Sequence, residues 1–377
     1  MDMLMTMHFL LICLAIGAPI RSQVLPPIGP FEAEMARPAA ATEPDDADEG
    51  DEADDGESEL AEPTGAAGPD IRYSADLSDD ELQRRWTDDL ESLGSISVGF
   101  ADQGRLINAA RMPQDDAWIL ERPTLAYGTR EAVEALINAF RAVRKQFPES
   151  APARLSHIGN EDGGYLRPHH SHQSGRDADI GFFYRNDKVP GRGVRREKLM
   201  DPARNWALVK TLITQSDVQV ILVDRGIQNI LRAWALAKGE DRDFVDRVFA
   251  RGHHALVQHA RHHKDHFHVR FYAPRSQELG RRVQPLLAQR PEQKLVMHKV
   301  RGGQTLGHIA RTYDTTVKAI QIANHMRGSF LHLGQQLRVP LRKPCTHCPL
   351  PPPVVVPPRC LPASTVASAS AETGVSE

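Results

Sequence analysis

The sequence predicts an α+β fold, followed by a small module with the order strand, helix, helix, strand. Segments with helical spacing of apolar residues and segments with strand alternation follow one another without the regular βαβ rhythm of a parallel sheet. At 377 residues and 41% hydrophobic content, the chain is long enough for one substantial core and a smaller one. The first and last segments have compositions that cannot build a core.

The N-terminal segment has the pattern of an export signal. An apolar run from Phe9 to Ala18 is too short to span a bilayer and stands where the core of a signal peptide would stand. We therefore expect residues 1–22 to be a signal peptide and the protein to be periplasmic or secreted, with no stable membrane insertion.

Charge is distributed unevenly along the chain. The net charge is −3, yet residues 32–62 hold 14 Asp and Glu against one Arg, so the remainder is basic. Residues 23–70 are predicted to be a disordered acidic linker. The basic remainder suits a polyanionic partner, but no nucleic-acid-binding motif accompanies it, and a nucleic-acid partner is not expected.

The elements of the main domain follow from local patterns. A short helical lead-in is predicted within residues 71–94, opened by Asp79 to Glu81. Apolar spacing predicts a helix from Thr129, which can cap it, to Phe147. The remaining predicted elements are helices at 206–215 and 227–237 and strands at 177–184, 218–223 and 266–272.

Two patches concentrate metal-ligand residues, at 168–179 and 262–268. Side chains two residues apart on a strand share a face, so His266 and His268 point the same way. Gly175 lets the chain turn, so that His172 and Asp179 can converge on one ion. Two histidines and a carboxylate suit zinc, and three protein ligands leave a fourth position for water, as catalytic zinc sites do.

The amino-acid sequences of these patches resemble those of a known family. The segments Ser171-His172-Gln-Ser-Gly-Arg-Asp-Ala-Asp179 and Asp265-His266-Phe-His268-Val-Arg are similar to the penicillin-insensitive murein endopeptidases, within the lysostaphin, D-Ala-D-Ala peptidase and hedgehog (LAS) group. The resemblance implies a LAS-type zinc metallopeptidase domain over residues 95–280, with a small antiparallel sheet and surrounding helices. It implies one zinc ion held by His172, Asp179 and His268, and cleavage of the D-alanyl-diaminopimelate cross-links of peptidoglycan.

The general base is less defined than the ligands. The resemblance implies that His266 is the catalytic histidine that does not bind zinc. Asp265 stands where the carboxypeptidase branch places a glutamate base, although it can instead orient an imidazole. His263 matches a further family position and is the third candidate. His169 and Asp177 are expected behind the ligands or against the substrate.

The C-terminal module, residues 295–341, follows a polar connector at 281–294. Its predicted elements are strands at 298–300 and 337–340 and helices at 306–313 and 317–323. The segments from Gly303 to Leu306 and from Leu333 to Pro340 resemble a LysM domain, which implies binding to glycans that contain N-acetylglucosamine. The candidate sugar contacts are Gly303, Gln304, Thr305, Leu306 and the residues from Met326 to Leu333.

A Pro-rich tail, residues 342–377, is predicted to be disordered. It holds Cys345 and Cys348, for which a local disulfide is the expected state in an exported chain, and an odd Cys360.

Two other functions share these features. A D,D- or L,D-carboxypeptidase would trim stem peptides with the same fold and metal, and an inactive LysM protein would only bind the wall. In each case the expected partner is peptidoglycan, through stem peptides or glycan, and the expected state is a monomer.

Overall fold

The computed structural model describes residues 71–166, 169–191, 194–250, 252, 255–290, 295–341 and 350–363. The predicted signal peptide, acidic linker and Cys345–Cys348 pair lie outside these residues. None of the described helices is long and apolar enough to cross a membrane.

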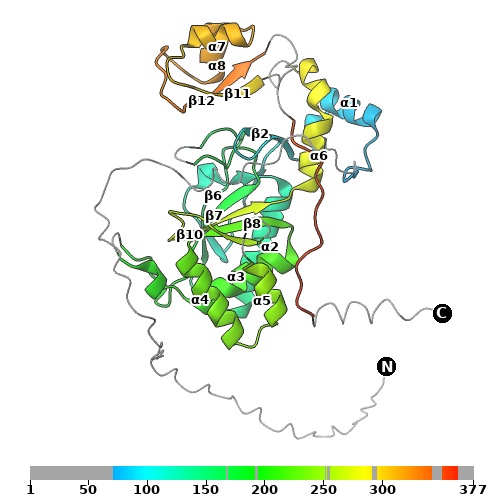
Figure 1. Ribbon diagram of the computed structural model, residues 1–377. Helices are drawn as coiled ribbons and strands as arrows, with labels where there is room; N and C mark the ends of the chain where they lie inside the picture. Colours follow the sequence, from blue (N-terminus) through cyan, green and yellow to red (C-terminus); the bar gives the residue numbers. More distant parts are fainter. Residues whose placement is uncertain are drawn as a thin grey trace, which may run out of the picture. The chain divides into compact units, whose positions relative to one another are not determined.

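A six-stranded sheet forms the centre of the main domain (Figure 1). Its inner pairs are antiparallel and its two edge pairs are parallel. The strands, in spatial order, are β4 (Trp118–Leu120), β6 (Ala153–His157), β7 (Asp177–Gly181), β10 (His266–Phe271), β8 (Val218–Val223) and β9 (Val257–His259). The mixture of this sheet with separate helices confirms the α+β class.

Helices pack with this sheet to form the main hydrophobic core. They are α2 (Arg130–Gln146), α3 (Pro202–Gln215), α4 (Arg225–Ala237) and α5 (Arg242–Val248). The Thr129 side chain accepts a hydrogen bond from the backbone N–H of Ala132, as its predicted capping role requires. Helix α3 begins at Pro202 rather than at Trp206, because Asp201 caps it and proline suits the first helical position.

A second core lies between the N-terminal lead-in and the last helix of the domain. Gly280 of that helix lies so close to strand β1 that an added Cβ would stand 1.9 Å from the carbonyl oxygen of Ser97. Trp86 is fully buried, and its indole N–H donates to the carbonyl of Leu286. The elements here are α1 (Asp79–Asp88), β1 (Ile96–Gly99), β2 (Gly104–Ile107), α6 (Pro274–Arg282) and 3-10 turns at Leu90–Leu93 and Gln284–Gln289.

Shorter pieces complete the main domain. Strands β3 (Ala110–Arg111) and β5 (Tyr127–Gly128) form a two-stranded sheet. Single 3-10 turns lie at Pro123–Leu125 and Arg196–Lys198.

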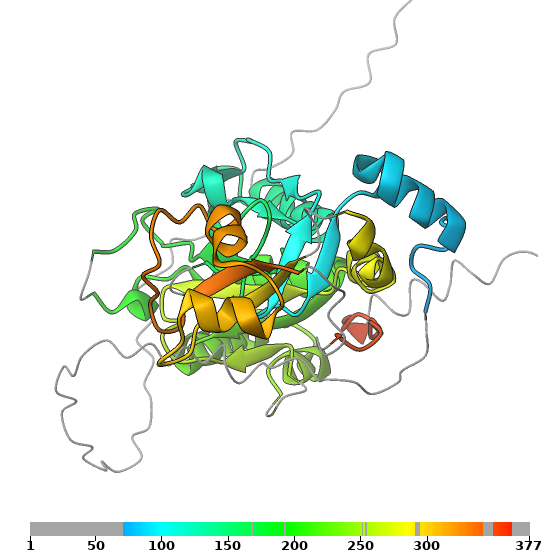
Figure 2. The same cartoon turned by 90° about the horizontal axis from the view of Figure 1, so that it is seen from above.

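The C-terminal module has its own small core and the predicted strand, helix, helix, strand order. Strands β11 (Leu295–Lys299) and β12 (Gln336–Pro340) pair antiparallel. Helices α7 (Leu306–Thr312) and α8 (Val317–Ala323) lie together beside them (Figure 2).

Residues 350–363 lie within the predicted tail. Residues 350–362 form no strand or helix, but the segment makes defined contacts. The Arg359 guanidinium lies 2.8 Å from the carboxylate of Asp217, and Cys360 packs partly buried against the main core. The predicted domain borders otherwise stay predictions.

Candidate metal centre

Three neighbouring strands place one histidine on each side of Asp179. The sheet register pairs Asp179 of β7 with His157 of β6 and with His268 of β10. Side chains of directly opposed residues on one face have Cβ atoms about 4.5–5.5 Å apart and therefore meet. Asp179 thus lies between two imidazoles in the middle of the sheet.

The predicted ligands His172, Asp179 and His268 come together around one carboxylate oxygen. Oδ1 of Asp179 lies 3.2 Å from Nε2 of His172 and 3.0 Å from Nδ1 of His268. Tetrahedral zinc with bonds of about 2.0–2.1 Å separates its ligand atoms by about 3.3 Å. The three side chains are buried, and each of the two imidazole nitrogens lies from Oδ1 at about the separation of two zinc ligands.

His172 is held in a fixed orientation by its backbone and its ring. Its φ of 66° lies in the left-handed region, which side chains with a Cβ adopt only where their surroundings enforce it. Nδ1 lies 2.7 Å from the carbonyl oxygen of Ile158 and therefore donates to it. This leaves the lone pair of Nε2 for a metal, as in other histidine ligands.

Asp177 lies behind both imidazoles. Its Oδ2 accepts from the backbone N–H of His172 at 3.0 Å, and its Oδ1 lies 3.3 Å from Nε2 of His268. Oδ1 also accepts from Nε of Arg270 at 2.6 Å. Burial alone would raise the pKa of Asp177, but Arg270 and His268 hold it well below its usual range. Asp177 is therefore an anion that contacts two of the predicted ligand residues, His172 and His268.

Asp179 also lines an open cavity of about 370 Å³. Nε2 of His266 lies 3.7 Å from Oδ2 of Asp179, and Nδ1 of His169 lies 3.8 Å from it. His157, His169, His266 and Asp265 are among the residues that line the cavity. A substrate that enters here meets the face of Asp179 on which His266 stands.

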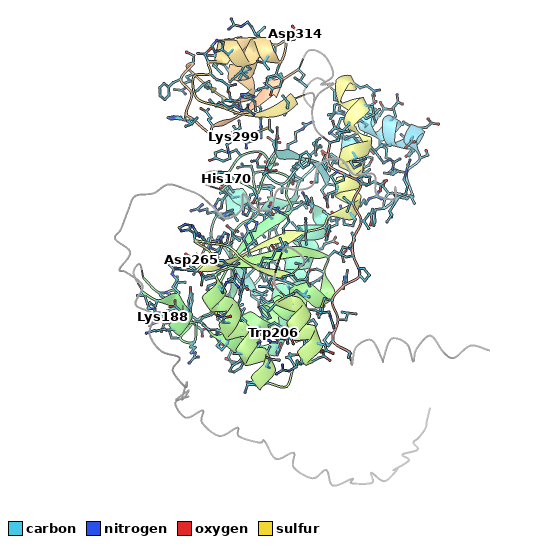
Figure 3. All side chains as sticks on the ribbon, in the orientation of Figure 1. His170, Lys188, Trp206, Asp265, Lys299 and Asp314 are labelled. Atoms are coloured by element: carbon cyan, nitrogen blue, oxygen red, sulfur yellow. The ribbon has the colours of Figure 1, made fainter. Side chains whose placement is uncertain are left out.

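Asp265 holds the ring of His266. Its Oδ1 lies 2.7 Å from Nδ1 of His266, and its Oδ2 lies 3.2 Å from the Arg196 guanidinium. Consecutive side chains of a strand point to opposite faces, so a strand through both residues would turn Asp265 away from His266. Strand β10 begins only at His266, so Asp265, labelled in Figure 3, is free to bend towards the imidazole.

The comparison with protein families agrees with this geometry. The model of the penicillin-insensitive murein endopeptidases matches residues 97–291, more than half of the chain. The chain belongs to this family. A LysM domain matches residues 298–340, and a search of curated proteins finds no match. This family member is therefore a peptidase that acts on peptidoglycan and carries a wall-binding module.

Electrostatics keep the carboxyl group of Asp179, a predicted ligand, ionised. Burial alone would raise the pKa of Asp179, but His172 and His266 hold it well below its usual range. Burial lowers the pKa of His263 to about 4, with His268 and His266 adding to the effect. His263 is therefore neutral, with Nδ1 at 2.8 Å from the carbonyl oxygen of Arg261 and its ring centroid 4.9 Å from that of His266.

His157 belongs to the site but was not predicted. Its Nε2 lies 3.1 Å from Oδ2 of Asp179. Among the described residues, His157, His169, His172 and Asp179 offer ligand atoms that all lie within 4.8 Å of one another. The alternation in β6 marks His157 as buried, after Ala153 and Leu155, but does not place it beside Asp179.

Proposed function

We propose that the chain is a zinc endopeptidase that cleaves the D-alanyl-diaminopimelate cross-links of peptidoglycan. The observation that supports this most is the convergence of Nε2 of His172 and Nδ1 of His268 on Oδ1 of Asp179. Two imidazoles and one carboxylate are a ligand set that suits zinc and leaves an open position. When bound, zinc polarises a substrate carbonyl and lowers the pKa of a water.

His266 is the proposed proton carrier. Its Nδ1–H donates to Asp265, which leaves Nε2 as the acceptor on the cavity side. Burial alone would lower the pKa of His266, but Asp179 and Asp265 raise it above its ordinary value. Nε2 takes a proton from the attacking water and returns it to the leaving amine of the cut peptide. Asp265 then acts as the residue that positions His266, and His263 as a neutral neighbour.

The cavity lining carries charges of both signs. Arg122, Arg154 and Arg196 line it together with Glu121, Asp179 and Asp265, and Arg154 pairs with Glu121 as Arg196 does with Asp265. Such a lining can meet both the carboxylates and the amines of a peptide.

The LysM module supplies the proposed glycan contact. Oε1 of Gln304 accepts from the backbone N–H of Arg301 at 2.7 Å, so this side chain orders the first turn. Leu306 is 2% exposed in the module's core and supports the turn from beneath. Gly303 and Thr305 are exposed and remain candidates for direct contact.

Two apolar side chains in the second predicted glycan loop extend this candidate surface. Phe330 is 77% exposed and Leu333 is 79% exposed. Large exposed apolar side chains commonly mark binding surfaces. A weak glycan anchor raises the local concentration of wall peptides at the tethered active site.

Both domains act on the cell wall, so the enzyme works outside the cytoplasm. Export through a signal peptide at residues 1–22 is part of the proposal.

Digestion of cross-linked, purified wall tests the bond that is cut. Mass spectrometry of the released fragments is expected to show cross-linked dimers turning into monomers. His172→Ala should lose both zinc and activity. His266→Ala should keep its zinc and lose activity by roughly 10²–10⁴-fold, the usual contribution of a general acid or base. His308→Ala, on the exposed side of α7, is the matched control and should behave as the wild type.

Two results would reject the proposal. Shortened monomers with intact dimers would identify a carboxypeptidase. A wild-type protein that holds no zinc and acts no differently from His172→Ala would be a wall-binding protein without catalysis.

A further inference from the structure

A second cavity adjoins the one that Asp179 lines. It holds about 480 Å³, and its lining comes from two segments, within residues 194–197 and 262–265. Arg196 and Asp265 line both cavities, so the two are direct neighbours. The proposed reaction takes place in the first cavity and gives the second one no role.

The lining of this second cavity has three basic side chains and two acidic ones. Each acidic side chain is paired with an arginine: Glu197 lies 2.8 Å from Nε of Arg195, and Asp265 lies 3.2 Å from Arg196. Lys264 is the third basic residue, and its exposed side chain makes no ion pair among the described residues. The pKa of Glu197 is lowered first by its hydrogen bond with Arg195 and more weakly by the charge of Lys264, so the ammonium group lies near this carboxylate. One further anion would balance the lining.

Lys264 stands beside the proposed proton carrier. It directly precedes Asp265, whose Oδ1 lies 2.7 Å from Nδ1 of His266. In the proposed reaction, Nε2 of His266 returns a proton to the leaving amine. The amine side of the cut bond therefore lies near His266 and close to the Arg196–Asp265 pair, which also lines the second cavity. A group attached next to that amine is within reach of a long lysine side chain.

We propose, on the basis of the proposed function, that Lys264 binds the carboxylate that diaminopimelate carries on the carbon bearing the leaving amine. An ammonium group and a carboxylate form a charge-assisted hydrogen bond, which is stronger than one between neutral groups. Val194, 45% exposed, lines the same cavity and offers apolar contact to the methylene chain of diaminopimelate. Lys264 thus selects the substrate and takes no part in proton transfer.

Two soluble cross-linked peptides that differ only at this carboxyl group test the contact. One carries the carboxylate and the other a carboxamide, and each is incubated with the zinc-loaded full chain. The wild type should cleave the carboxylate peptide with a kcat/KM about 10-fold higher, the usual contribution of a hydrogen bond to a charged group. The difference should lie in KM, because the contact is made equally before and during the reaction.

Lys264→Gln should remove this preference. Its kcat/KM for the carboxylate peptide should fall about 10-fold, whereas its kcat/KM for the carboxamide peptide should not change. Lys264→Arg keeps the positive charge and should retain most of the preference. Lys145→Gln is the matched control: Lys145 is exposed in the last turn of α2 and lines neither cavity, so this variant should behave as the wild type.

Equal cleavage of the two peptides by the wild type would overturn the contact. So would an equal loss on both peptides in Lys264→Gln, because damage to the fold does not depend on the charge of the substrate. A wild type that cleaves neither peptide would reject the proposed function itself, and this contact with it.

Discussion

At the scale of single residues, the sequence predicts which side chains meet at Asp179 better than it predicts what surrounds them. Strand alternation and the sequences of the two motifs predict that His172, Asp179 and His268 meet. His157 could not be found in this way, because its position opposite Asp179 depends on an irregularity in the pairing of β6 with β7. The register skips Ser156 between Leu155 and His157. Such bulges re-aim a side chain, and local propensity does not locate them.

Asp177→Asn tests whether the carboxylate behind the ligands tunes metal binding. The substitution removes the charge that pairs with the buried Arg270 and that orients His268. We expect metal affinity to fall about 10–100-fold, measured by competition with a chromogenic chelator. Stability should fall by about 3–5 kcal/mol, because Arg270 is left buried without its partner.

Asp246→Asn is the matched control for this change. Asp246 pairs with Arg232 at 2.6 Å, and both side chains are more than 40% exposed. Exposed pairs contribute about 0–1 kcal/mol, so neither metal affinity nor stability should change much. Equal losses in the two variants would show that Asp177 contributes only charge balance.

At the scale of elements, prediction succeeds where a pattern is long enough to show its period. Helix α2 and strands β8 and β10 match their expected ranges closely. Strands of two or three residues, such as β3, β4 and β9, are too short to show alternation. Helix α6 was missed because its sequence is largely polar, although Leu279 is fully buried.

The turn between His172 and Asp179 is the element on which the site depends most. Gly175 has a φ of +74°, and an added Cβ would lie 2.7 Å from Cδ2 of Leu106 and 3.1 Å from the backbone nitrogen of Thr129. Gly175→Ala should therefore destabilise the protein by more than about 1 kcal/mol, and move the two ligands apart. Thermal melting and zinc content measure the two effects.

Gly239→Ala separates backbone strain from displacement of the site. Gly239 has a φ of +79° at the end of α4, and an added Cβ would meet nothing within 4 Å. It should lower the melting temperature by roughly 2–4 °C for each kcal/mol lost and leave zinc content unchanged. Unaltered zinc content in Gly175→Ala would mean that the turn does not set the ligand spacing.

At the scale of the whole molecule, packing between elements adjacent in sequence is predictable, whereas packing between distant segments is not. The LysM module builds its core from elements adjacent in sequence, and all four were predicted. The lead-in packs against residues about 200 positions later, as the bond from Trp86 to Leu286 shows, and no local pattern reports such a contact.

The wall-binding role of the second LysM loop can therefore be tested apart from the active site. Phe330→Ala and Leu333→Ala remove large exposed apolar side chains that carry no core packing. Each should weaken sedimentation of the enzyme with purified wall and slow digestion of that wall, because the anchor no longer concentrates the substrate. Cleavage of a small soluble cross-linked peptide should keep its kcat/KM, since neither residue belongs to the metal centre.

Ile322→Ala removes an apolar side chain that is 64% exposed on α8, outside both loops, and should change neither measurement. Slower cleavage of the soluble peptide in Phe330→Ala would show that the loop acts on catalysis and not on anchoring.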